Sequence, residues 1–130
     1  MAKSYRIERV NETIKEIIGD LLLNGIKDPR VGFVTITGVR TSGDLSVARV
    51  HYSVLGDEEV RSTAHKGLVS AARFIQRVLA KELKVRISPH LVFIYDDSLD
   101  RAMRIEEMLR EAEAGSQEPK ADVDGDKATE

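Results

Sequence analysis

The 130-residue sequence contains no cysteine and no tryptophan. Without cysteine there can be no disulfide, no thiolate metal ligand and no cysteine nucleophile. No apolar run approaches the roughly 18 residues that cross a bilayer. The first six residues, MAKSYR, also lack the apolar middle of a signal peptide. We therefore expect a cytoplasmic protein with no membrane partner.

Aromatic residues are also scarce, at 5% of the chain. We expect Phe74 and Phe93 to lie in the core, which leaves Tyr52 and Tyr95 as the aromatic side chains that a sheet could offer to a nucleic-acid base. This supply is too thin for a surface that stacks successive bases. Any nucleic-acid contact is expected to recognise backbone and shape.

The residue types that carry catalysis or bind metals do not form recognisable motifs. The three histidines show no metal-ligand spacing, and the sequence has no glycine-rich phosphate loop and no nucleophile elbow. Asp96, Asp97 and Asp100 could together hold a hard cation, but helix capping is the better explanation at a helix start. We expect a protein that is not an enzyme and needs no cofactor.

Charge is unevenly distributed along the chain. The net charge of -2 combines 18 basic and 15 acidic residues in 1–110 with 2 basic and 7 acidic residues in 111–130. The last stretch has no aromatic residue and a single branched aliphatic one, so it cannot bury enough surface to order itself. We predict a folded domain over 1–110 and a disordered acidic tail over 111–130.

Hydrophobic periodicity predicts the order helix, strand, strand, helix, helix, strand and short helix. The expected ranges are a helix over 6–24 ended by Gly25, strands over 33–41 and 45–55, either two short helices or one kinked helix over 57–84, a strand over 91–95, and a helix from Asp97 or Ser98 with Ala102, Ile105 and Leu109 on its inner face. Gly38 predicts a bulge in the first strand, and a phase change predicts another in the second. The economical fold is α+β, with a three-stranded sheet covered by helices on one face.

The stretch from Ser70 to Lys84 has two unlike sides when read as a helix. Its basic residues are spaced at i, i+4, i+8 and i+11, within an arc of roughly 80°. They are Arg73, Arg77, Lys81 and Lys84. Apolar residues occupy the opposite side, and no acidic residue falls within the basic arc. Such a stripe suits a row of phosphates, although a simple solvated helix face is the alternative.

Several separated motifs resemble one family in order and in one register, from about Arg6 to Leu109. They are IKDPR at 26–30, VTITGV at 34–39, SGDLSVARV at 42–50 and RISPHLVFIYDDSLDRAMRI at 86–105. The family is ribosome-binding factor A, which matures the bacterial small ribosomal subunit. The resemblance implies a type II KH-like fold and a transient, non-enzymatic role in late ribosome biogenesis. It also implies binding to small-subunit rRNA and to the immature small subunit.

Within this family a glycine kinks the two central helices, and Arg73 occupies the matching position here. Any bend must therefore be made without that glycine. With the resemblance added, we extend the predicted RNA-binding set beyond the stripe to Lys27, Arg30 and Arg86. For Arg30, an ion pair with Asp28 is an equally good explanation.

A protein-interaction module is the competing hypothesis. In it, a ribosomal protein or an assembly GTPase docks on the exposed edge of the sheet without direct RNA contact. Metal-dependent hydrolysis at the aspartate cluster is a third. In either binding role we expect a monomer.

Overall fold

The structure is a computed structural model that describes residues 2–116, and the chain divides into two units, up to residue 96 and from residue 97 onward. The elements are α1 (Ala2–Asp20), a π-helical turn (Leu21–Gly25), a 3-10 turn (Pro29–Val31), β1 (Val34–Thr41), β2 (Val47–Val54), α2 (Glu58–Leu83), β3 (His90–Tyr95) and α3 (Ser98–Ser116). The predicted order is confirmed, with the two central helices joined into one.

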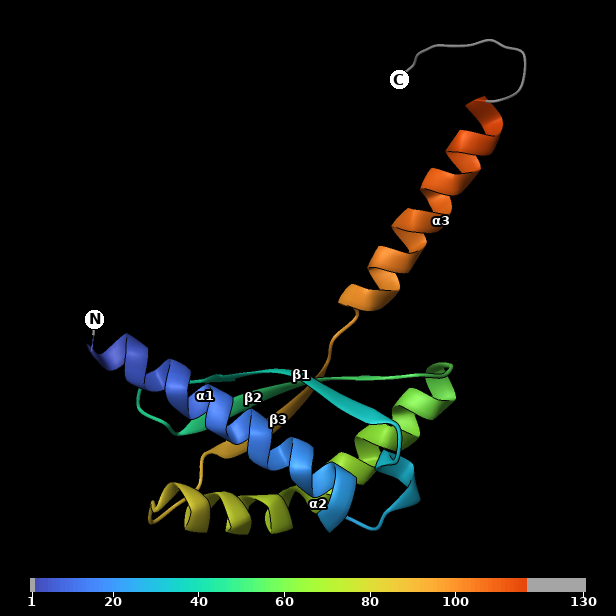
Figure 1. Ribbon diagram of the computed structural model, residues 1–130. Helices are drawn as coiled ribbons and strands as arrows, with labels where there is room; N and C mark the ends of the chain where they lie inside the picture. The colour runs from blue at the N-terminus through green and yellow to red at the C-terminus, as the bar shows by residue number, and fades with distance from the viewer. Residues whose placement is uncertain (1, 117–130) are drawn as a thin grey trace. The chain divides into compact units, whose positions relative to one another are not determined.

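α1 is amphipathic and lies along β1 in the first unit (Figure 1). Ile14 and Ile18, one helical turn apart, are fully buried. The helix continues into the π-helical turn, and the chain leaves it at Gly25, since Ile26 is already extended. The predicted stop at Gly25 is confirmed.

β1 and β2 form the predicted antiparallel hairpin. Their register shifts between Ile36 and Gly38, so Thr37 is an extra residue and the bulge predicted at Gly38 is confirmed. The bulge predicted in the second strand is wrong, because β2 pairs without interruption from Ala48 to Val54. The phase change in the sequence arises because Leu45 belongs to the turn, where its φ is 63°.

β3 returns to the sheet parallel to β2, giving the strand order β1-β2-β3. The side chains that alternate toward one face of the sheet are buried with residues of α1 and α2. They are Ile36, Val39, Ala48, Val50, Tyr52, Leu91 and Phe93. The fold is the predicted α+β, type II KH-like arrangement, with helices on one face of a three-stranded sheet.

α2 is one continuous helix of 26 residues, although its two halves run in different directions (Figure 1). Asp57 caps its start, where the carboxylate accepts the Val60 N–H at 3.0 Å. The sequence left open two short helices or one kinked helix, and the structure has the latter. The bend is made without a glycine at position 73.

α3 forms the described part of the second unit and reaches Ser116, beyond the predicted boundary at residue 110. Within this unit Ala102, Ile105 and Leu109 are exposed, and the predicted inner face stays a prediction. The described part of this unit holds a single helix, and nothing within it can bury them. The tail predicted over 111–130 lies mostly outside the described residues. Within residues 2–116, no helix combines the length and the apolar character needed to cross a membrane.

A close contact fixes the 3-10 turn against the middle of α2. Gly67 is buried, and a Cβ atom placed there would lie 2.8 Å from Val31 Cγ1 and 2.9 Å from Arg30 Cβ. These distances are shorter than normal van der Waals contact, so only glycine permits this approach. The residue therefore serves packing, although glycine weakens a helix interior.

Gly67→Ala is expected to lower the free energy of unfolding by about 1–3 kcal/mol, because the methyl group must displace the turn. The matched control is Gly19→Ala in α1, where a Cβ would meet nothing within 4 Å. That change should raise the free energy of unfolding by up to about 1 kcal/mol through helix propensity. Urea denaturation of both variants measures the difference, and a Gly67→Ala protein as stable as the control would contradict the packing role.

The turn between β1 and β2 is organised by the carboxylate of Asp44. Asp44 Oδ1 accepts hydrogen bonds from the hydroxyls of Ser46 (2.7 Å) and Ser42 (2.8 Å) and from the Ser46 N–H (3.1 Å). These hydrogen bonds lower the pKa of Asp44 from 3.8 to about 2, and the bond from the Ser46 hydroxyl has the largest effect. The ionised form therefore holds the turn together.

The stabilisation from Asp44 should be complete above pH 3.8 and disappear as the pH falls through about 2, because the folded-state pKa is depressed. NMR titration of the Asp44 carboxyl carbon measures this directly. Ser46→Ala should raise the observed pKa toward 3.8. A wild-type midpoint already near the ordinary value would contradict the hydrogen-bonded turn.

Candidate nucleic-acid interface

α2 has one side in the core and one side in solvent. Leu68, Ile75 and Leu79 are fully buried, while Arg73, Arg77 and Lys81 on the opposite side are exposed. The predicted two-sided character of this helix is confirmed. We call the exposed side, defined by Arg73, Arg77 and Lys81, the basic stripe.

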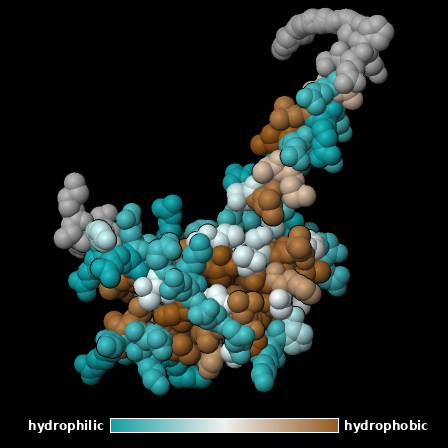
Figure 2. Space-filling view, viewed as in Figure 1, coloured by the Kyte–Doolittle hydropathy of each residue, from teal (hydrophilic) through white to brown (hydrophobic). Residues whose placement is uncertain are grey.

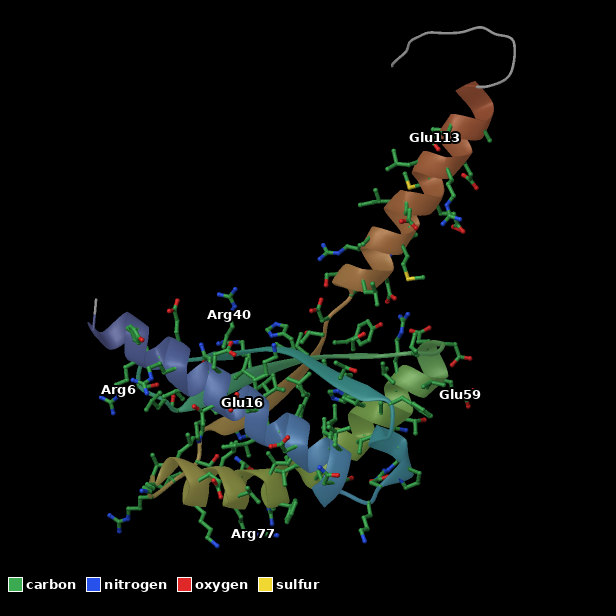
Figure 3. All side chains as sticks on the ribbon, viewed as in Figure 1. Arg6, Glu16, Arg40, Glu59, Arg77 and Glu113 are labelled. Atoms are coloured by element: carbon green, nitrogen blue, oxygen red, sulfur yellow. The ribbon has the colours of Figure 1, made fainter. Side chains whose placement is uncertain are left out.

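The basic stripe carries uncompensated charge. Arg77 projects from α2 away from the sheet (Figure 3). Its guanidinium lies 5.9 Å from the ring centroid of Phe74, within range of a cation–π contact. Among the described residues, no acidic side chain lies within salt-bridge distance of the three stripe cations. Their charge is therefore free to meet an anionic partner.

The prediction for one aromatic residue is wrong, and one of the two candidates for base stacking is buried. Phe74, expected in the core, is 38% exposed, because it lies beside the stripe and packs against Arg77. Tyr52, considered for base stacking, is only 2% exposed. Its hydroxyl lies 3.1 Å from His65 Nδ1 and burial raises its pKa. The Tyr52 ring is therefore part of the core.

Lys84 does not belong to the helical arc in which the sequence placed it. α2 ends at Leu83, and Lys84 adopts a left-handed conformation (φ 57°) while its N–H caps the helix. From Lys84 onward, the positions of the side chains no longer follow helical spacing. Lys84 and Arg86 are exposed in the loop that follows. The amide of Gln76 ties this loop to the helix by donating to the Pro89 carbonyl at 3.3 Å.

The second predicted group of cations lies in the loop before β1. Lys27 is exposed, and Arg30 forms a two-pronged ion pair with Asp28, whose shortest distance is 2.7 Å. The pair lowers the pKa of Asp28 and raises that of Arg30, chiefly through the side-chain hydrogen bonds. The predicted ion pair of Arg30 with Asp28 is confirmed, and RNA binding by Arg30 stays a prediction. Because the 3-10 turn packs on Gly67, the loop adjoins the middle of α2.

Sequence reasoning missed Lys66. It is exposed on α2, seven residues and thus about two helical turns before Arg73. The signal was present in the spacing. Lys66 was missed because the predicted stripe was confined to the stretch from Ser70 to Lys84. Lys66 lies next to Gly67 and hence next to the loop that carries Arg30.

The aspartate cluster is used structurally. Asp96 accepts the Thr37 hydroxyl at 2.7 Å, and Asp97 pairs with Arg101 at 3.3 Å. Among the described residues, no three His, Cys, Asp or Glu side chains are grouped so that they could hold a metal ion. The hydrolysis hypothesis has no geometric support in this part of the chain.

The fold and this surface define a small KH-like α+β domain with a cationic helix side. The family model for ribosome-binding factor A matches residues 6–109. The ribosome-binding factor A of Anaeromyxobacter dehalogenans strain 2CP-C is 47% identical over 125 residues, covering 95% of this chain and 91% of that protein. The Geobacter sulfurreducens protein is 43% identical over 108 residues, covering 83% and 92%. This chain belongs to the ribosome-binding factor A family.

Solved structures agree with this assignment. The crystal structure of ribosome-binding factor A from Thermus thermophilus aligns with a TM-score of 0.61 and 27% identity, covering 68% of this chain and 93% of that chain. The solution structure of a Thermotoga maritima protein gives 0.65 and 30%, covering 73% and 91%. A homology model of the Thermus thermophilus factor, fitted into a cryo-EM map of a complex of the factor with the 30S subunit, gives 0.55 and 28%, covering 67% and 91%.

Proposed function

We propose that this chain is a ribosome biogenesis factor that binds small-subunit rRNA and the immature small subunit in the cytoplasm, using the basic stripe of α2. Family membership supports the role, and the 30S complex of the Thermus thermophilus relative supports the target. The observation that carries the proposed surface is that Arg73, Arg77 and Lys81 are exposed without acidic partners among the described residues.

The spacing of the stripe favours contact with an RNA backbone. Residues four apart on a helix are separated by about 6 Å along its axis, so Arg73, Arg77 and Lys81 present three separate charges in a row. Lys66 lengthens the row toward the loop of Lys27 and Arg30, and Lys84 and Arg86 follow its other end. The buried ring of Tyr52 argues against a sheet that stacks bases.

This role requires binding and no bond-making chemistry, so the factor acts without catalysis and without a cofactor. A monomeric state and an assembly GTPase as a second partner stay predictions that accompany the proposal.

Charge reversal of the stripe should weaken rRNA binding. Arg73→Glu with Arg77→Glu is expected to lower affinity for naked small-subunit rRNA by about 10- to 100-fold and to make the slope of log affinity against log salt less negative by about 1–2, because two phosphate contacts are lost. Thermal unfolding should change little, since both side chains are exposed.

The matched control is Arg40→Glu with Arg49→Glu, which reverses two exposed, directly paired arginines on the sheet. Filter binding over a salt series compares the two double variants. Equal losses in both would mean that only net charge matters, and an unchanged affinity in the stripe variant would remove the stripe from the mechanism.

The proposed target is tested by sedimentation of the tagged full-length chain with purified small subunits. The chain should cosediment with immature subunits at low ionic strength, and less or none of it should cosediment with mature subunits. Charge reversal of the stripe should abolish cosedimentation with immature subunits. Cosedimentation only with particles that carry ribosomal proteins, and no affinity for naked rRNA, would favour the protein-interaction hypothesis instead.

A further inference from the structure

A long groove runs between α1 and the free edge of the sheet. β1 is the end strand of the sheet, and α1 lies over it. Two hollows of about 470 Å³ each follow β1, one along Val34–Ile36 and the other along 37–40. Both are lined by Glu12 and Lys15 of α1. Together they accompany β1 over nearly its whole length.

The outer edge of β1 offers hydrogen-bonding groups to this groove. In an antiparallel pair, alternate residues direct their backbone groups away from the neighbouring strand. The N–H of Thr41 points away from β2 and donates a hydrogen bond to Asn11 Oδ1 of α1 at 2.9 Å. By the same alternation the backbone groups of Val39 face outward. An edge of this kind is a template for one further strand.

The α1 wall of the groove is acidic. Glu8, Glu12, Glu16 and Asp20 recur every four residues along the helix and all line the two hollows. Glu16 lies midway along α1, and hydrophilic side chains cover this helix in the space-filling view (Figures 2 and 3). Lys15 and Arg40 are the basic residues in the lining, so acids outnumber bases two to one.

The charge of this wall selects among possible occupants. RNA is disfavoured, because phosphates would face the row of carboxylates. The chain's own residues 111–130, with 7 acidic and 2 basic residues, are disfavoured for the same reason. A second copy of the chain would bring an identical acidic row beside the first. A positively charged segment is the complementary occupant.

One end of the groove adds an apolar contact. Leu23 is 81% exposed, and with Leu22 and Val34 it lines the hollow next to the start of β1. An extended strand directs alternate side chains to opposite faces, so a segment that alternates basic and apolar residues could meet both the carboxylates and this apolar end.

We propose that the groove between α1 and β1 binds an extended, lysine- or arginine-rich segment of another protein, which adds to β1 as a fourth strand. The backbone of β1 supplies hydrogen bonds and the acidic row of α1 supplies charge selectivity. The proposal does not rest on the basic stripe, since the two surfaces lie on different helices.

The test uses the full chain and a fluorescein-labelled peptide of about eight residues. Every second residue of the peptide is lysine, and the residues between are valine or threonine. Fluorescence anisotropy measures affinity, and NMR amide shifts locate the bound peptide. Binding should shift the amides of β1. A peptide N-methylated at alternate residues should bind about tenfold more weakly, because it lacks the N–H groups that pair with the edge.

Matched variants separate the groove from net charge. Glu12→Gln with Glu16→Gln should weaken peptide binding about tenfold. Glu107→Gln with Glu111→Gln, the same i,i+4 change on exposed residues of α3, should leave it within about twofold. Reversal of Arg73 and Arg77 should not weaken it, which keeps this result distinct from the RNA test.

Four outcomes would overturn the proposal. They are an absence of peptide binding, equal losses in the two glutamine variants, equal binding of the N-methylated peptide, and amide shifts that lie away from β1.

Discussion

Burial of one side of α2 against the sheet is the interaction on which the rest of this structure depends. Leu68, Ile75 and Leu79 are completely buried in one cluster with Val50 and Phe93. Full burial of each such side chain stabilises the fold by about 1.5–3 kcal/mol. This contact fixes the rotation of the helix about its axis. The stripe cations must then face solvent, even though their like charges repel one another.

A net charge of -2 hides two surfaces of opposite sign in the first unit. The stripe on α2 is basic, while the wall that α1 presents to the edge of β1 is acidic. Fields of this kind weaken beyond a Debye length of roughly 8 Å at physiological salt, so each surface acts on what lies next to it. The separation would let one small domain hold RNA on one side and a basic protein segment on another without mutual competition.

The sequence predicted most of the first unit because its signals are local and periodic. The 3.6-residue repeat through Ile14 and Ile18 predicts a helix, and the glycine at position 38 predicts a bulge. Each signal depends only on residues a few positions away. Two failures concern α2 and its C-terminal cap. Phe74 looked apolar enough for the core, but its helical angle places it beside Arg77. Lys84 kept the helical spacing while the backbone had already turned into a left-handed cap.

For the candidate sites, prediction from the sequence is limited by the separation of the segments that meet. The stripe could be predicted because it follows from one helix, and even the missed Lys66 obeys its spacing. The contact of the Arg30 loop with Gly67 joins segments more than 30 residues apart, and no periodicity in either segment reports it. The groove beside β1 likewise exists only once α1 and the edge strand are brought together.

Site-specific photo-crosslinking on immature small subunits tests the central claim most directly, namely that the outward side of α2 meets RNA. A crosslinker at Ser70, exposed between Lys66 and Arg73, should attach to rRNA, whereas one at Thr35, exposed on β1 beside the acidic wall, should attach to protein. Attachment of the Ser70 probe to protein alone, or of the Thr35 probe to rRNA with equal yield, would contradict the account.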